Sequence, residues 1–172
     1  MPLPISRPPA APFDPRHFRH ALSQFATGVT VITTATASGD LLGLTATSFN
    51  SVSLQPPLVL WSLGSNASSL APFSATSHYV VNVLSAEQGA LAMRFASKIH
   101  NRFDGVDYDL SEHGQPILRG ALAWFECANR SRYPEGDHVI FVGEVARFAF
   151  TPGAPLIFHA GAFVSATAPL VG

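Results

Sequence analysis

The sequence is poor in charged residues and in cysteine. Asp, Glu, Lys and Arg make up 12% of its 172 residues, about half of the ~25% that is usual in soluble domains. It has no run of Lys or Arg, so the electrostatic footprint of a nucleic-acid-binding protein is missing. Cys127 is the single cysteine, which excludes an internal disulfide and a zinc cluster built on cysteines. We therefore expect a cytoplasmic protein with no nucleic-acid partner.

Long apolar runs are also absent. No stretch approaches the roughly 18 residues of a membrane-spanning helix, so we expect no membrane association. Residues 1–13 are rich in Pro and Ala and lack the apolar core of a signal peptide. We expect them to form an N-terminal tail and residues 14–172 to form one domain. Low charge beside 47% hydrophobic residues favours a homodimer, because obligate interfaces resemble protein interiors.

Two kinds of binding motif are missing. Gly39 and Gly43 are not followed by a phosphate-loop pattern, so a nicotinamide cofactor would have to bind outside a Rossmann fold. The histidines do not show metal-ligand spacing, so we expect no metal site. Cys127 has no base beside it in the sequence and is interpreted as an inert, buried thiol.

The hydrophobic pattern predicts a mainly β protein. β-branched or apolar runs predict strands at 29–36, 41–50, 58–63, 78–84, 120–130, 138–150 and 156–159. Helices are expected from Asp14 to Gly28, over 69–75 and over 85–95, the last with a Ser85–Gln88 capping box. Residues 97–118 are predicted to form a long polar loop. Because hairpin-length connections dominate, we expect six or more antiparallel strands in a closed or nearly closed barrel with short peripheral helices.

One predicted strand has an unusual composition. From Gly43 to Leu58 the sequence reads GLTATSFNSVSLQPPL, with small and hydroxyl residues where a core strand would carry bulky aliphatic ones. Small side chains let a flat ligand lie close to the backbone, and hydroxyls can bond ring heteroatoms or a phosphate. On composition alone, an edge strand whose hydroxyls face water explains the segment at least as well.

This segment resembles the signature of the flavin reductase-like family, the FMN-binding split barrels, and especially the reductase components of two-component flavin-dependent monooxygenases. Further matches follow the same order as in the family: residues 28–34 (GVTVITT), 101–106 (NRFDGV), 136–138 (GDH) and 155–161 (PLIFHAG). They extend over residues 28–163, and Asn101 stands where the family more often has an acidic residue. The resemblance implies a six-stranded antiparallel split β-barrel of Greek-key topology.

The resemblance also implies an activity. The chain would be an NAD(P)H:flavin oxidoreductase that transfers hydride from NADH or NADPH to FMN or FAD and supplies the reduced flavin to a partner monooxygenase. The alternative is a non-catalytic flavin-binding or electron-transfer protein with the same barrel. The sequence does not choose between the two flavins or the two nicotinamides.

By the same resemblance, three groups of residues would bind the flavin. The ring and ribityl wall would be Thr45, Ala46, Thr47, Ser48, Ser51 and Val52. The phosphate would lie at a helix start, where free N–H groups favour anions, beside Ser65, Asn66, Ser68 and Ser69; plain helix capping by Ser68 is the alternative. The remaining candidates are Phe95, Lys98, Arg102, Phe103, His159 and Phe163. Either Lys98 or Arg102 would pair with phosphate, and Phe163 stands where Tyr is common.

His138 is the catalytic candidate. It follows Asp137 at the start of a predicted strand, and the resemblance places it at the nicotinamide, through the carboxamide or beside the ring. A turn-capping histidine is the alternative. Hydride transfer between the two cofactors needs no protein acid or base, because the protein contributes distance and orientation. We therefore expect His138 to position NAD(P)H rather than to move a proton.

Overall fold

The computed structural model describes residues 13–165, so the predicted tail at 1–12 and the last residues, 166–172, lie outside it. Three α-helices are present in this range: α1 (Pro15–Ser23), α2 (Leu70–Ala75) and α3 (Gly89–Ala96), the last preceded by a short 3-10 turn, η1 (Ala86–Gln88). The strands are β1 (Thr27–Gly28), β2 (Thr30–Ala35), β3 (Leu41–Ala46), β4 (Asn50–Leu54), β5 (Pro57–Gly64), β6 (His78–Val83), β7 (Tyr108–Leu110), β8 (Pro116–Leu118), β9 (Ala123–Glu135), β10 (His138–Phe150), β11 (Leu156–His159) and β12 (Ala162–Ser165).

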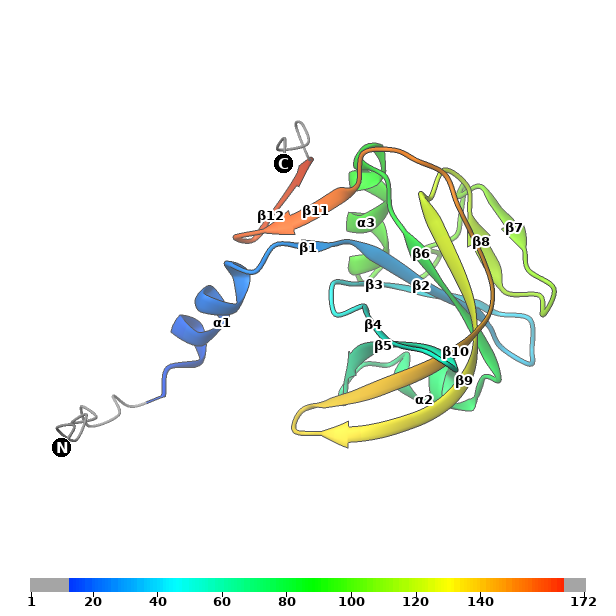
Figure 1. Cartoon of the computed structure of the whole chain (residues 1–172), viewed down its shortest axis with the longest axis horizontal. Coiled ribbons are helices and arrows are strands. Elements are labelled where there is room, and N and C mark those ends of the chain that lie inside the picture. The colour runs from blue at the N-terminus through cyan, green and yellow to red at the C-terminus, as the bar shows by residue number, and fades with distance from the viewer. Residues whose placement is uncertain (1–12, 166–172) are drawn as a thin grey trace, which may run out of the picture.

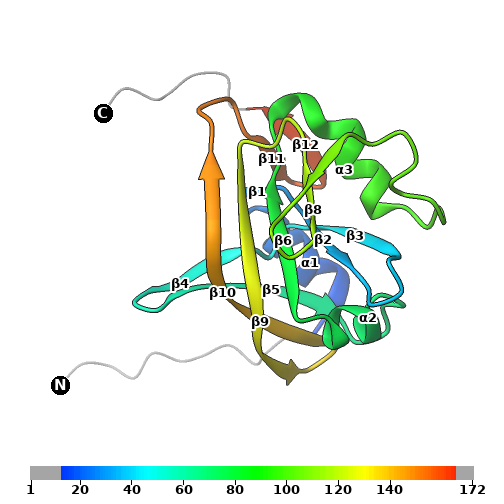
Figure 2. The same cartoon turned by 90° about the vertical axis from the view of Figure 1, so that its right-hand side faces the viewer.

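A seven-stranded sheet with the order β3-β2-β6-β9-β10-β5-β4 dominates the molecule, and all its neighbours are antiparallel (Figures 1 and 2). The mainly β, antiparallel class is therefore confirmed. The predicted six-stranded, closed barrel is wrong in strand number and in closure, because β3 and β4 end the sheet as separate edges. The physical reason is a break at residues 47–49, which divides the predicted strand 41–50 without a Gly or Pro to signal it.

The sheet encloses an aromatic core. Trp61 of β5 stacks on Phe141 of β10 with ring centroids 4.5 Å apart, and meets Phe73 and Tyr79 edge-on. All four side chains are fully buried. Aromatic pairs in these geometries add stability beyond the burial of their surface. This core therefore fixes how β5, β6 and β10 pack, and with them the ends of the strands that carry the candidate site.

A second, smaller core lies on the outer side of β2 and β3. There α3 buries Ala92 and Phe95 among residues of β2, β8 and β11. The predicted Ser85–Gln88 capping box is present at the entry to α3, and the Gln88 amide oxygen accepts a 3.0 Å hydrogen bond from the backbone N–H of Ser85. Helix α3 thus covers the strand that the sequence analysis assigned to the flavin.

Helix α1 stands away from the sheet at one side of the molecule (Figure 1). It starts as predicted, with the Asp14 carboxylate accepting a hydrogen bond from the backbone N–H of Arg16 at 2.9 Å. It ends at Ser23 rather than at Gly28, because Thr27 and Gly28 pair with β11. None of its residues is buried. Within residues 13–165, none of the helices has the length and apolar character to cross a membrane.

The predicted loop at 97–118 contains the β7–β8 hairpin, whose strand β8 lies against β2 and β6. Strands of three residues are too short to show an alternating pattern, so the sequence did not reveal them. The hairpin turn is held by Glu126 of β9, a fully buried residue whose Oε1 accepts hydrogen bonds from the Ser111 hydroxyl and from the backbone and ring of His113. Burial raises the pKa of Glu126, but these hydrogen bonds outweigh it and lower the pKa.

The contacts of this turn should make the stability of the protein depend on pH. The ring of His78 stacks on that of His113, with the ring centroids 3.8 Å apart. Two effects lower the pKa of His78 below 6.5: mainly its burial and, to a smaller extent, the charge of His113. The unfolded chain thus binds a proton at His78 before the folded one does. We expect the melting temperature to fall from about pH 7.5 to about pH 5.5. The decrease in melting temperature over this pH range should be smaller in His78→Gln than in the exposed-site control His100→Gln. Equal decreases in both variants would contradict the role of His78.

Candidate functional site

Three segments that are distant in the sequence meet at one end of the main sheet. In the β5–β10 pairing, Gly64 lies opposite His138, and the backbone N–H of Ser65 donates to the carbonyl of Asp137 at 2.9 Å. The β3–β4 turn joins them, because the Ser48 hydroxyl accepts a 2.9 Å hydrogen bond from the backbone N–H of Ser62. Predicted ring-wall, phosphate and nicotinamide residues are thus neighbours at this end.

His138 is held by the residue before it. Its Nδ1 lies 2.7 Å from Oδ1 of Asp137, and because a carboxylate only accepts hydrogen bonds, this nitrogen carries the proton. The pKa of Asp137 is lowered mainly by the hydrogen bond from His138 and then by the charge of His138. The charge of Arg19 in α1 makes a smaller contribution in the same direction. The His138 side chain is 51% exposed. Its Nε2 is therefore the ring nitrogen left to meet a ligand.

The predicted ring wall divides into two parts. The Thr45 hydroxyl donates to the carbonyl of Ala92 in α3 at 2.6 Å, and Ala46 is buried in the aromatic core. The two side chains therefore lie on opposite faces of β3, and both are engaged within the protein. Thr47 and Ser48 are exposed in the turn beyond it. Ser51 and Val52 follow on β4, where a register shift between Ser51 and Ser53 bends the edge strand.

The predicted phosphate segment lies beside His138. Ser65, Asn66 and Ser68 are exposed in the loop between β5 and α2, and Ser69 is the N-cap of α2 without a side-chain capping bond. The hydroxyls and the amide of this loop therefore face outward rather than into the helix. Helix α2 has six residues, so its dipole is small. Phosphate binding here stays a prediction that rests on the loop's side chains and N–H groups.

Four further candidates lie along β3, where α3 and the following loop cover it. Phe95 is 1% exposed and contacts Phe103 edge-on at 5.0 Å. Both rings lie over Gly43, where a Cβ would come within 2.4 Å of Phe95 Cε1. The Arg102 guanidinium donates to the carbonyls of Gly43 and Ser97, while Lys98 is exposed. In this structure Phe95, Phe103 and Arg102 hold the loop on β3, and their contact with a flavin stays a prediction.

The last two candidates lie on the small sheet β1-β11-β12, next to α1. His159 and Phe163 are partly buried on the β11–β12 hairpin, which is tied to α1 by a 2.8 Å bond from the backbone N–H of Ala160 to the carbonyl of Ser23. Thr27 on β1 pairs with Phe158, and its buried hydroxyl has no partner among the described residues. Sequence reasoning missed Thr27, because a lone Thr before a Gly gives no binding signal.

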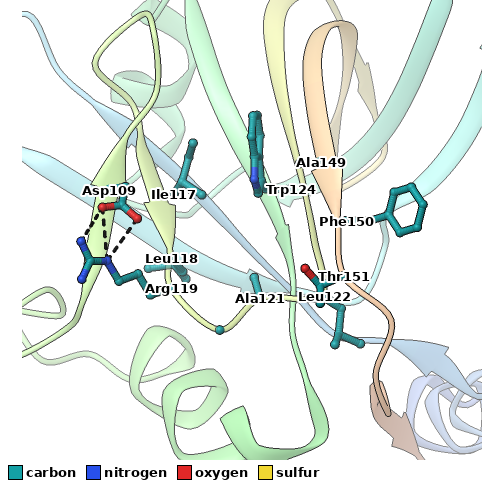
Figure 3. A pocket seen from close by; sticks show the side chains of 11 residues that line it. Asp109, Ile117, Leu118, Arg119, Ala121, Leu122, Trp124, Ala149, Phe150 and Thr151 are labelled. Carbon is teal, nitrogen blue, oxygen red and sulfur yellow. Dashed lines mark hydrogen bonds and ion pairs between the residues drawn. The ribbon is translucent and has the colours of Figure 1, made fainter.

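A hollow of about 240 Å³ lies at the opposite end of β9 and β10 from His138. Figure 3 shows Trp124 at its centre, the Asp109–Arg119 pair on one side and Phe150 pointing outward on the other. Arg119 Nη2 lies 2.6 Å from Oδ1 of Asp109. None of the predicted cofactor residues lines this hollow. Within residues 13–165, no group of three or more His, Cys, Asp or Glu side chains could hold a metal ion.

Comparison with known proteins identifies the family. The model of the flavin reductase-like domain matches residues 22–167. The chain is 47% identical over 148 residues to the FMN reductase (NADH) SmoA of Agrobacterium fabrum, covering 86% of this chain and 84% of SmoA. It is 39% identical over 156 residues to the flavin-dependent monooxygenase reductase subunit HsaB of Mycobacterium tuberculosis, covering 88% and 82%. It spans only 44% of the length of a probable flavin reductase of Rhizobium meliloti, at 43% identity.

The solved structures agree. The NADH:FAD oxidoreductase SgcE6 of Streptomyces globisporus, in complex with NAD and FAD fragments, superposes with a TM-score of 0.85 at 39% identity, covering 93% of this chain and 98% of that one. The chain therefore belongs to the flavin reductase-like family. With relatives named as NADH-dependent reductases and as monooxygenase components, the prediction of an NAD(P)H-dependent flavin reductase is confirmed.

The residues at this end of the sheet fit a flavin and a nicotinamide. Thr47, Ser65, Asn66 and Ser68 are exposed and supply both hydrogen-bond donors and acceptors, as the heteroatoms of a flavin require. On the small sheet, the buried hydroxyl of Thr27, which has no partner within residues 13–165, is a further polar atom next to the hairpin of His159. His138 offers a single oriented ring nitrogen beside them.

Proposed function

We propose that this chain transfers hydride from NADH to FMN or FAD at the end of the sheet where Ser48, Ser65 and His138 meet, and that it supplies the reduced flavin to a separate monooxygenase. One observation carries the proposal. The pairing of Gly64 with His138 and the hydrogen bond from Ser65 to Asp137 bring the predicted flavin and nicotinamide residues to the same place. NADH is the nicotinamide in the names of the relatives that specify one.

The residues have separable roles. The turn at Thr47 and Ser48 is fixed to β5 through Ser62 and forms a small-residue surface for a planar ring. His138, locked by Asp137, accepts a hydrogen bond at Nε2 from the nicotinamide carboxamide and so orients its ring. A bound flavin supplies the two-electron acceptor. The protein contributes proximity and orientation, and no side chain has to exchange a proton during the transfer.

Turnover with added flavins tests this function. Purified protein should consume NADH catalytically with at least one of FMN, FAD and riboflavin, and its flavin content as isolated shows whether flavin is a retained group or a diffusing substrate. Retained flavin without NADH oxidation would favour the electron-transfer alternative. If neither NADH nor NADPH is oxidised with any of the three flavins, the proposal that this site is a reductase site is wrong.

We also propose that the chain works as a homodimer. Large apolar side chains lie exposed on β4 and β10, on either side of the start of β5, and we call this set the apolar patch: Val52, Leu54, Phe148 and Phe150. Leu54 is 89% and Phe150 73% exposed. Phe148 continues a stacked row through Phe125 to Phe49, so the patch extends the packed interior outward. Monomers rarely leave such surfaces bare, and a second copy would cover this one.

The apolar patch gives a prediction of oligomeric state. The native protein should elute in size-exclusion chromatography with light scattering at twice the chain mass, and Phe148→Ser/Phe150→Ser should elute as a monomer. The control Met93→Ser/Leu110→Ser changes two equally exposed apolar residues on α3 and β7 and should stay dimeric. A native monomer, or a dimer that survives the patch variant, would contradict the proposal.

We place the protein in the cytoplasm, which suits its one free, buried cysteine.

A further inference from the structure

Helix α1 concentrates positive charge in a chain that has little. Its sequence, PRHFRHALS, carries two arginines and two histidines within five positions. Arg16, Arg19 and His20 are spaced three and four residues apart, so they share one side of the helix. Phe18 and Leu22 fall on the other side. The first turn contains no acidic residue, and only Asp14 at the cap lies beside the cationic face.

The cationic face lies next to the candidate nicotinamide site. Figure 1 shows α1 on the same side of the molecule as the β9–β10 turn that carries His138. The carbonyl of Ser23 is bonded to the β11–β12 hairpin, which anchors the end of α1 beside His159. The charge of Arg19 reaches Asp137, whose pKa it helps to lower after the larger effect of His138. The helix is thus anchored at one end by the Ser23 carbonyl, and Arg19 lies within electrostatic range of Asp137.

All but one of the other arginines of the described range are engaged elsewhere; the exception is Arg132 of β9, which is exposed and whose side chain has no hydrogen-bond or ion-pair partner within residues 13–165. Arg119, Arg130 and Arg147 form ion pairs with acidic residues, and Arg94 and Arg102 donate to backbone carbonyls. Arg16 and Arg19 are exposed, and their side chains make no hydrogen bond or ion pair within residues 13–165. An exposed guanidinium with its donors unused is suited to binding a phosphate through two parallel hydrogen bonds.

We propose that Arg16 and Arg19 bind the pyrophosphate of the reduced nicotinamide dinucleotide while its nicotinamide end meets His138. This inference rests on the proposed function and adds an outer wall to its site. The two positive charges of Arg16 and Arg19 match the two negative charges of the pyrophosphate. In the dinucleotide, the pyrophosphate is joined through one ribose to the nicotinamide ring that His138 orients. The Asp137 carboxylate keeps its negative charge while it accepts the hydrogen bond from His138, so the two guanidinium groups bind the pyrophosphate in the presence of this charge. FAD also carries a pyrophosphate, but the position of α1 beside His138 favours the nicotinamide.

Charge removal with FMN as the flavin tests this, because FMN has no pyrophosphate. In Arg16→Gln/Arg19→Gln we expect the KM for NADH to rise about tenfold or more, since the charge-assisted hydrogen bonds to the pyrophosphate are lost, with kcat changed less than about twofold. The rate with 1-benzyl-1,4-dihydronicotinamide, which has the ring but no phosphate, should stay unchanged. Arg16→Lys/Arg19→Lys keeps both charges but loses the paired hydrogen bonds, so its KM for NADH should fall between those of the native protein and the Gln variant. The KM of the native protein should also rise with salt more steeply than that of the variant.

The matched control is Arg119→Gln/Arg147→Gln. It removes the same two positive charges from exposed ion pairs, and its KM for NADH should remain native. An equal rise in this control would mean a general field effect and overturn the inference. So would an unchanged KM in the α1 variant, a loss of the benzyl-dihydronicotinamide reaction, or a KM that rises for FAD but not for NADH. A native protein that oxidises neither substrate would refute the proposed function instead.

Discussion

His138→Ala is expected to raise the KM for NADH about three- to tenfold, the range that corresponds to one hydrogen bond of ~1 kcal/mol. The affinity for flavin should remain close to native, because the residues predicted for the flavin come from other segments. The kcat at saturating NADH should keep its order of magnitude, since the transfer needs no protein acid or base. Steady-state kinetics with varied NADH, together with a flavin titration, measures all three quantities.

Two companion variants sharpen this result. Asp137→Ala leaves the ring of His138 in place but removes the carboxylate that fixes its Nδ1 proton, so the KM should move in the same direction by a smaller factor. Glu135→Ala changes the residue opposite His138 in the β9–β10 pairing and should leave the KM native. If all three variants behave alike, the turn rather than the imidazole sets the affinity, and His138 has no separate role.

The second large effect concerns stability. Trp61→Ala is expected to lower the free energy of unfolding by about 3–5 kcal/mol, the usual cost of deleting a large buried aromatic ring. Trp61 is fully buried and contacts Phe73, Tyr79 and Phe141, so no single neighbour can fill the cavity. Urea unfolding followed by circular dichroism, with the midpoint and slope both reported, gives the change.

The other tryptophan is the natural control. Trp124 is partly exposed at the hollow shown in Figure 3, and Trp124→Ala should cost clearly less than Trp61→Ala. A similar loss in both variants would show that the two sides of the sheet contribute equally, against an architecture organised around the Trp61 cluster.

Much of the fold could be predicted because long strands carry a clear pattern. The bounds of β10 and β11 agree with the predicted 138–150 and 156–159. The separation of β3 from β4 could not be predicted, because residues 47–49 contain no turn-forming Gly or Pro. Hydrogen bonds between Ser48 and Ser62 of β5 hold the chain in this turn. The closure of the sheet likewise depends on which edges meet. The short strands β7 and β8 are stabilised by contacts with β2 and β6 and by the hydrogen bonds of their turn to Glu126, rather than by local preference.

The site was predictable to the extent that its residues form motifs. Ser65 and His138 belong to matched or adjacent segments, and the structure places them together. Thr45 could not be told from Thr47 in the sequence, because both are hydroxyl residues two positions apart. Only the packing of α3 shows that the Thr45 hydroxyl is taken by Ala92. The cationic face of α1 was invisible for a similar reason: a helix of Arg and His reads as a solvated surface until its neighbour is known.

Anaerobic mixing of NADH with the protein and FMN or FAD distinguishes a reductase from a non-catalytic flavin-binding protein. We expect a rapid loss of the flavin's visible absorbance, with one flavin reduced for each NADH consumed, and a slower phase at low NADH in His138→Ala. Flavin reduction no faster than in the same mixture without the protein would contradict the reductase function.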